Sequence, residues 1–285
     1  MPDTLDLRLL RTFVSAARSG SLSAAAVQVL RTQSAVTMQI QRLEDALGQK
    51  LLHRSGSGVR PTNSGERFLV YAERILRTHD DAVAEYTRKG IHGSISFGCP
   101  EDYLVAFGPA LLQRFGAAHP AVEVTVVAAP TTELRKLLGQ QQVDVALMSS
   151  SEAAASGSIL RKERLVWVAN RADVPLADFG EPVPLALSSS NTLDHKAACA
   201  ALEKAGIAYR VSFASDSMAG LIAIARSGLA ISVFTQTAVP PDLFIQDTTL
   251  PALPEIGLHV GVAQQGRSVA VTAFAEHVRR LLPQL

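Results

Sequence analysis

The spacing of apolar residues changes near residue 90, and this change constrains the fold more than any other feature of the chain. Before that point, apolar side chains recur every three or four residues, the period of amphipathic helices. From Gly93 onward, short apolar runs such as Ile95-Ser96-Phe97 alternate with helical patterns. That alternation is typical of parallel sheets with crossover helices. The sequence therefore predicts a helical head joined to an α/β body.

The composition fits a folded chain of about two domains. The 285 residues exceed one usual domain length of ~100–200, and 47% are hydrophobic, which excludes wholesale disorder. Two cysteines, Cys99 and Cys199, make neither a disulfide framework nor a clustered zinc site. Arg226 interrupts the best apolar run before the ~18 residues that a membrane span needs, and Met1–Asp6 lacks the basic region of a signal peptide. We therefore expect a soluble cytoplasmic protein with no membrane contact.

The net charge of +1 hides an uneven distribution. Residues 1–62 contain eight Lys or Arg against four Asp or Glu, and residues 63–90 contain five of each sign. Residues 91–285 contain fourteen basic and seventeen acidic side chains. A basic head favours binding to a polyanion, although an ordinary solvated surface has a similar imbalance in many proteins.

The head is predicted to contain three helices. The first covers about Leu5–Arg18, the second about Ser23–Leu30, and the third begins after the N-cap Thr32 and ends at Gly48. The exposed face of the third helix carries amides, hydroxyls and an arginine: Gln33, Ser34, Thr37, Met38, Gln41 and Arg42. Gln and Arg can bond base edges, and Ser and Thr can reach phosphates, although an ordinary polar helix face is an equal alternative on these residues alone.

A small basic hairpin is predicted after the third helix. The runs 50–54 and 59–61 flank a flexible tip, Ser55-Gly56-Ser57-Gly58. Arg54 and Arg60 would lie close to phosphates or the minor groove, and Thr32 would join them in holding the DNA backbone. Three helices followed by a basic wing indicate a winged helix-turn-helix.

A long helix is predicted from about Thr62 to Lys89. Six of its residues recur at intervals of three and four, as in a heptad seam that Ala72 and His79 weaken: Leu69, Ala72, Leu76, His79, Val83 and Tyr86. We favour pairing of two copies through this seam over packing of the helix on its own domain. A dimer would present two recognition helices to half-sites one DNA turn (~34–36 Å) apart.

The first ninety residues resemble the LysR-type transcriptional regulators. The resemblance is carried by Leu9–Phe13, Gly20–Ser23 with Ala25-Ala26, Gln33–Thr37, Gln41–Glu44, Leu47-Gly48, Leu51–Arg54 and Val59–Gly65. Ser34 stands where proline is usual in the family, and Met38 where arginine or another polar residue is common, so Met38 would contact a thymine methyl group. The form Arg31-Thr32-Gln33-Ser34-Ala35-Val36 looks closest to the LrhA/HexA-like subgroup, repressors of motility and exoproduct genes.

The rest of the chain is similar to the effector domain of that family, which resembles type 2 periplasmic binding proteins. Asp144–Leu147 and Ala225–Ile231 carry this resemblance best. The expected fold is α+β overall. It has a mainly α winged helix-turn-helix at 1–62, a linker or dimerisation helix at 63–90, and a two-lobed α/β effector domain at 91–285. Lobe I would cover about 91–165 plus 258–285, and lobe II about 166–257.

Ligands of open α/β sheets lie beyond the carboxyl ends of the strands, near helix N-termini. The residues predicted there are Cys99, Pro100, Glu101, Thr131, Thr132, Ser149, Ser150, Ser188, Thr192, Ser215, Asp216 and Phe234. Their hydroxyls, together with helix N–H groups, suit a small carboxylate or other polar acceptor, whereas Glu101 and Asp216 disfavour a highly anionic ligand. Each hydroxyl taken singly is more simply explained as a helix N-cap.

These patterns predict a ligand-responsive transcription factor that is not an enzyme and carries no metal or cofactor apart from a small-molecule co-inducer or co-repressor. Asp194 and His195 adjoin serines on one short segment, which does not supply the geometry of a catalytic triad. The resemblance implies a homotetramer that associates through the 63–90 helix and the effector domains, bends a double-stranded DNA operator and contacts RNA polymerase, as a repressor or an activator. The alternative is a cytoplasmic enzyme or small-molecule-binding protein whose helical head serves only oligomerisation.

Overall fold

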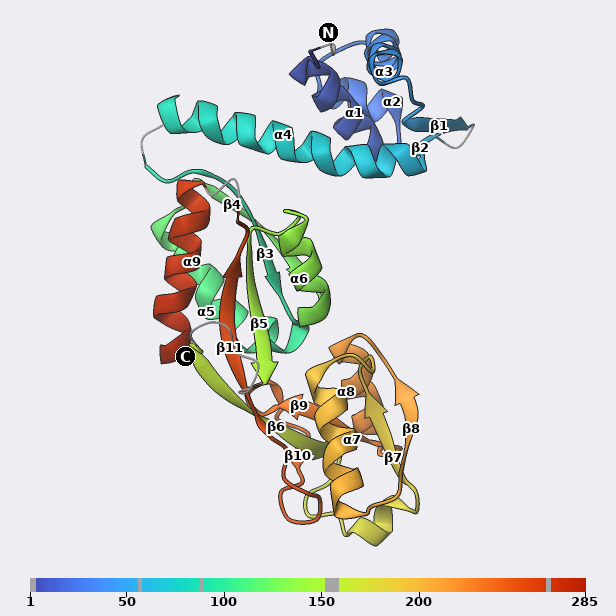
Figure 1. Ribbon diagram of the computed structural model, residues 1–285, viewed down its shortest axis with the longest axis vertical. Helices are drawn as coiled ribbons and strands as arrows, with labels where there is room; N and C mark the ends of the chain where they lie inside the picture. Colours follow the sequence, from blue (N-terminus) through green and yellow to red (C-terminus); the bar gives the residue numbers. More distant parts are fainter. Residues whose placement is uncertain (1–3, 56–57, 88–89, 152–158, 265–267) are drawn as a thin grey trace. The chain divides into compact units, whose positions relative to one another are not determined.

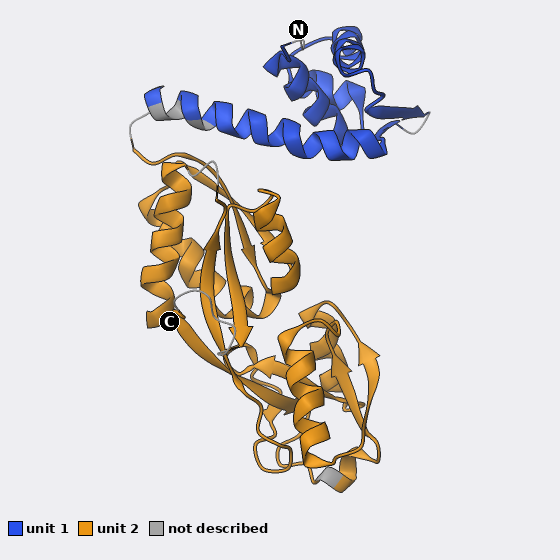
Figure 2. Ribbon diagram, in the orientation of Figure 1, with its two compact units in different colours: residues 1–89 blue, residues 90–285 orange. Residues whose placement is uncertain are grey.

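The computed structural model describes residues 4–55, 58–87, 90–151, 159–264 and 268–285. The chain divides into two compact units, residues 1–89 and 90–285 (Figure 2). The centre of the predicted wing tip, residues 56–57, and the predicted helix end near Lys89 lie outside the described residues. Among the residues described, none of the helices combines the length and the apolar character that crossing a bilayer requires.

The first unit contains the predicted helices and hairpin. Its elements are α1 (Leu7–Ser19), α2 (Leu22–Gln28), α3 (Gln33–Leu47), β1 (Leu52–Ser55), β2 (Gly58–Pro61) and α4 (Asn63–Thr87) (Figure 1). The predicted boundaries of α3 are confirmed, because the Thr32 hydroxyl accepts a hydrogen bond from Ala35 N at 3.2 Å and Gly48 ends the helix with a φ of 63°. Glycine adopts this left-handed conformation without the steric cost that a Cβ imposes.

One apolar core holds this unit together, and α4 is part of it. The core includes Leu10 and Phe13 of α1, Val36 and Ile40 of α3, and Ala72 of α4. α1 also forms ion pairs with α4, between Arg11 and Asp80 and between Arg18 and Glu73.

The predicted seam on α4 is therefore wrong in its first half. Ala72 and Leu76 are buried against α4's own domain, and Leu69 packs partly against the same core. The apolar face of α1 needs cover, and α4 supplies it within the chain. The large apolar residues that α4 leaves exposed are Tyr71, Ile75, Val83 and Tyr86.

The second unit is an α/β structure with two lobes. Its main elements in chain order are β3 (Gly93–Cys99), α5 (Glu101–Ala118), β4 (Val122–Ala128), α6 (Thr131–Gly139), β5 (Val145–Ser151), β6 (Arg161–Ala169), β7 (Val183–Leu187), α7 (Leu193–Ala205), β8 (Tyr209–Ala214), α8 (Met218–Ser227), β9 (Ile231–Thr235), β10 (Phe244–Ile245), β11 (Glu255–Val262) and α9 (Val269–Leu281). In lobe I, β3 pairs in parallel with β4 and β5; in lobe II, β7 pairs in parallel with β8 and β9.

Two long strands connect the lobes. β11 pairs antiparallel with β5 in lobe I and with the first residues of β6, and the remainder of β6 pairs antiparallel with β9 in lobe II (Figure 1). Through β11 the chain thus returns to the sheet of lobe I. α9 then packs Phe274 between Phe97 and Phe115, with ring centroids 5.0 and 4.8 Å away. These aromatic contacts fix the last helix in lobe I.

Candidate functional site

The recognition face predicted on α3 is open to solvent. Gln33, Ser34, Met38, Gln41 and Arg42 are exposed and Thr37 is half-buried, whereas the apolar residues of α3 face the core. Met38 is 53% exposed, so it offers an apolar contact in the middle of a polar face. Within the described part of the chain, Arg42 has no ion-pair partner and its guanidinium remains available for a ligand.

Several polar groups on this face already have hydrogen-bond partners. The Gln33 Oε1 atom accepts a bond from Ser23 Oγ at 3.2 Å, which holds this side chain beside α2 and leaves its NH₂ group as a donor. Gln41 Nε2 donates to Asp45 Oδ1 at 2.8 Å. The Thr32 and Ser34 hydroxyls lie 3.0 Å apart. The face is therefore arranged in advance of any contact, because its side chains are held by neighbours within the unit.

The wing lies beside α3 because a buried carboxylate ties the two together. Glu44 Oε1 accepts bonds from Leu51 N at 3.0 Å and Leu52 N at 3.2 Å, and Lys50 Nζ lies 2.6 Å from Glu44 Oε2. Burial alone would raise the pKa of Glu44, but these three bonds outweigh it and lower that pKa. Sequence reasoning noted Glu44 only as part of a motif and missed this positioning role.

The two arginines of the wing lie on opposite faces of the hairpin. The β1–β2 register sets His53 opposite Arg60 and Arg54 opposite Val59. Cross-strand partners share a face and neighbours along a strand alternate, so Arg54 and Arg60 point in different directions. Both are exposed.

A cavity of about 350 Å³ opens between the two lobes of the second unit. It is lined by eleven of the twelve residues predicted for the effector: Pro100, Glu101, Thr131, Thr132, Ser149, Ser150, Ser188, Thr192, Ser215, Asp216 and Phe234. Those residues come from strand ends and helix starts that are up to 134 positions apart in sequence, from Pro100 to Phe234. The volume lies within the ~300–1,000 Å³ range of ligand pockets.

Cys99 is the exception and must be removed from the predicted set. It is 1% exposed and belongs to the core of the second unit, because alternate residues of β3 point to opposite sides. Burial raises the pKa of the Cys99 thiol well above its ordinary value, and the nearby Asp102 carboxyl adds to this effect. The thiol is therefore held in its protonated, unreactive form.

Among the described residues of the lobe I wall, the Ser150 hydroxyl is a buried polar group without a partner. Thr131 Oγ1 accepts a bond from Ser149 N and lies 3.1 Å from Ser149 Oγ. Ser150 is 3% exposed, and its Oγ has no hydrogen-bond partner among the described residues. A buried hydroxyl without a partner costs roughly 1–3 kcal/mol, so such groups commonly mark a place where a ligand or water completes the set.

Hydrogen bonds cross from lobe I to lobe II beside the cavity, and Ser217 Oγ donates one of them to Glu101 Oε2 at 3.5 Å. Glu101 Oε2 accepts from Met218 N at 2.5 Å, at the start of α8, where the N-cap Ser217 makes no capping bond with its own side chain. Thr235 Oγ1 donates to Asp102 Oδ2 at 3.2 Å. Glu101 thus places a carboxylate at a helix N-terminus, which favours negative charge.

Sequence reasoning missed four charged residues of this cavity: Asp102, Asp194, Arg135 and Lys196. Asp102 is the most perturbed, because burial raises its pKa to about 7 and the nearby Asp194 carboxylate adds to the shift. Its position next to the predicted Glu101, in the first turn of α5, was the available signal.

The triad interpretation of the serine-rich segment is excluded by geometry. Asp194 Oδ2 accepts a bond directly from Ser188 Oγ at 2.5 Å, and His195 Nδ1 lies 2.8 Å from Ser188 O. The imidazole is therefore not placed between a serine hydroxyl and a carboxylate, as a nucleophilic triad requires.

Both units match models of one protein family. Residues 7–66 match the bacterial regulatory helix-turn-helix protein of the lysR family, and residues 88–283 match the LysR substrate binding domain. The HTH-type transcriptional regulator DgdR of Burkholderia cepacia is 48% identical over 99% of this chain and 96% of its own length. The HTH-type transcriptional regulator PecT of Dickeya dadantii is 32% identical over 88% of this chain and 79% of its own length.

Solved structures share the same fold. CbnR in complex with its target DNA superposes with a TM-score of 0.68 at 23% identity, covering 97% of this chain and 99% of that chain. At this identity the likeness concerns the fold. Together with the two matched models and the relatives that align along the chain, it leads to one conclusion: the chain belongs to the LysR family and is a DNA-binding transcriptional regulator with an N-terminal helix-turn-helix and a C-terminal effector-binding domain.

Proposed function

We propose that two copies of this regulator read a pseudo-palindromic operator through α3 and the wing. Base edges would be contacted by Gln33, Ser34, Thr37, Met38 and Arg42, with Gln41 beside them. Thr32, Arg54 and Arg60 would hold the phosphate backbone or the minor groove. The open polar face of α3 supports this proposal. The crystal structure of CbnR with its target DNA supports it as well, because CbnR has the same fold.

Self-association through α4 and the effector domains belongs to the same proposal. The exposed stripe of Tyr71, Ile75 and Tyr86 replaces the predicted seam as the surface for a second copy. An assembly of four chains would bend the operator and contact RNA polymerase in the cytoplasm. The segment Arg31–Val36 supports membership of the LrhA/HexA-like subgroup.

The effector is proposed to be a small polar molecule held in the cavity between the lobes. The observation that carries this proposal is the convergence of eleven predicted residues on one cavity, where the buried Ser150 hydroxyl has no partner among the residues that the structure describes. Four carboxylates, two of them Glu101 and Asp216, face two cations there, so a strongly anionic molecule is disfavoured. Because Glu101 and Asp102 bond across the lobes, a bound molecule that alters these contacts would change how the lobes pack.

The effector proposal is tested by thermal-shift screening of metabolites with the full chain, followed by titration calorimetry of each hit. Thr131→Val, Ser150→Ala and Ser188→Ala should each weaken binding about tenfold, since each removes a hydroxyl bond of roughly 1–1.5 kcal/mol. Thr248→Val is the matched control, because Thr248 is exposed and does not line the cavity. A confirmed ligand whose affinity is unchanged in all three cavity variants would place the effector site elsewhere.

The DNA proposal is tested by electrophoretic shift with the upstream DNA of the chain's own gene. Arg54→Ala should lower affinity for every sequence and reduce the salt slope by about one. Gln33→Ala should instead relax the preference between sequences, by about 1–3 kcal/mol at one base pair. An unchanged salt slope for Arg54→Ala would remove the wing from the interface, and a uniform loss for Gln33→Ala would reassign that amide to the backbone.

A further inference from the structure

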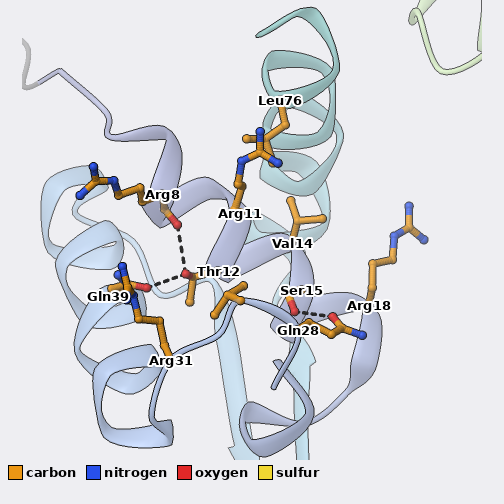
Figure 3. A pocket seen from close by; sticks show the side chains of 11 residues that line it. Arg8, Arg11, Thr12, Val14, Ser15, Arg18, Gln28, Arg31, Gln39 and Leu76 are labelled. Atoms are coloured by element: carbon orange, nitrogen blue, oxygen red, sulfur yellow. Dashed lines mark hydrogen bonds between the residues drawn. The ribbon is translucent and has the colours of Figure 1, made fainter. Parts of the chain in front are cut away.

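The first unit contains a second basic surface that lies apart from the face of α3. A pocket of about 530 Å³ opens between α1, the end of α2, α3 and α4 (Figure 3). Four of the residues that line it are arginines: Arg8, Arg11, Arg18 and Arg31. None of the residues proposed above to contact DNA lines this pocket. The DNA-reading role of the unit therefore does not account for this cluster.

Two of these arginines keep their charge uncompensated. Arg11 is paired with Asp80 and Arg18 with Glu73, both on α4. Arg8 and Arg31 are exposed, and within the described ranges neither forms an ion pair. In Figure 3, Arg8 and Arg31 lie on the same side of the pocket as Gln39, and Arg18 lies at the opposite side. The pocket therefore has a positively charged end that an anion can neutralise.

The polar groups between the arginines also present hydrogen-bond donors. Gln39 Oε1 accepts a bond from Thr12 Oγ1 at 2.6 Å, and Gln28 Oε1 accepts one from Ser15 Oγ (Figure 3). Each oxygen is thereby engaged, and each amide NH₂ group has no acceptor among the described residues. Thr12 is buried, so the Thr12–Gln39 pair forms a fixed floor below the charged rim.

We propose that this pocket binds a ligand through its phosphate groups. Guanidinium groups match phosphate oxygens with paired donors, and donor-only amides complete the coordination of a polyanion. The volume leaves room for a diphosphate together with the group to which it is attached, and the two unpaired arginines would offset most of the charge of the phosphates. Free polyphosphate and the backbone of the operator offer the same chemistry, and the experiment has one arm for each source.

In the first arm, titration calorimetry measures the affinity of the full chain for inorganic pyrophosphate at constant ionic strength. The double variant Arg8→Gln, Arg31→Gln should lose about tenfold in pyrophosphate affinity for each arginine. A hydrogen bond to a charged group contributes about a factor of ten or more to affinity. Arg54→Gln with Arg60→Gln removes the same charge from the wing and should leave pyrophosphate affinity unchanged. Both arginine pairs are exposed, so both variants should keep the melting temperature of the wild type.

The second arm measures operator affinity against salt for the same variants. If pyrophosphate binding is lost and the operator slope is kept, the pocket serves a free phosphate ligand. If both variants bind pyrophosphate equally but the pocket variant lowers the slope of operator affinity against salt by about two, the phosphates belong to the DNA backbone. A pocket variant that alters neither measurement would overturn the proposal. None of these outcomes depends on the effector cavity, so the two proposals fail separately.

Discussion

Replacing Glu44 should detach the wing from the recognition helix. This side chain is 3% exposed, and it accepts the backbone N–H groups of Leu51 and Leu52. Glu44→Ala leaves both donors buried without an acceptor, whereas Glu44→Gln keeps a carbonyl oxygen in the same place. The pair of variants therefore separates the acceptor from its charge.

The cost of each variant follows from these bonds. Two unsatisfied buried N–H groups cost roughly 1–3 kcal/mol each. Because local relaxation lets water hydrate them in part, we expect Glu44→Ala to lower the local stability by ~3 kcal/mol. Lys50 is 65% exposed and regains water when its partner is lost, so its ion pair adds little. Glu44→Gln loses only the additional strength of charge-assisted bonds, about 1 kcal/mol.

Hydrogen exchange of the full chain measures this local loss of stability directly at the amides of Leu51 and Leu52. A local loss of ~3 kcal/mol corresponds to about 100-fold faster exchange in Glu44→Ala, against roughly fivefold in Glu44→Gln. The folded-state pKa of Glu44 is lowered, so its contribution to stability is complete above the ordinary pKa of 4.5. That contribution is lost as the pH falls through the folded-state pKa. Unchanged protection of both amides in Glu44→Ala would refute the role assigned to this carboxylate.

Two further substitutions test packing and electrostatics. Gly65→Ala would place a Cβ 2.0 Å from Leu51 O, so we expect operator affinity and the melting temperature to fall by an amount equivalent to ~2 kcal/mol. Gly116→Ala is the control and should be neutral or stabilising, because nothing lies within 4 Å of the added Cβ. An equal effect of both substitutions would contradict the contact between Gly65 and Leu51. Asp102→Asn removes a carboxyl whose pKa burial raises from 3.8 to about 7. The folded state binds this proton more tightly, so wild-type stability should fall as the pH rises through that window and the variant should lose this dependence; parallel melting curves from pH 4 to 8 would argue against it.

The helices of the head and their boundaries could be predicted from the sequence because local signals determine them. Thr32 and Gly48 bracket α3 through a hydroxyl cap and a left-handed glycine, and both act within a few residues along the chain. The residues that line the cavity between the lobes could be predicted for a related reason. The carboxyl ends of parallel strands meet at one edge, so topology alone predicts that Thr131, Ser149 and Ser188 lie together.

The errors concern residues whose surroundings come from distant parts of the chain. Cys99 has the sequence position of a cavity residue, but the side of β3 on which it lies depends on how α5 and α9 cover the sheet. The apolar repeat of α4 fits a partner helix and its own domain equally well, and only the packing of α1 shows that Ala72 and Leu76 face inward. Periodicity defines the apolar face of a helix without specifying what covers it.

By itself, the sequence determined a basic winged helix-turn-helix, a linking helix and a two-lobed body, because periodicity, caps and charge are local properties. The tertiary structure alone decided that Glu44 holds the wing, that Glu101 caps a helix of the opposite lobe, and that Arg8 and Arg31 share a pocket. These roles depend on atoms brought within about 3–4 Å by the folding of distant segments. Burial then changes the energy of each charge, which residue order does not encode.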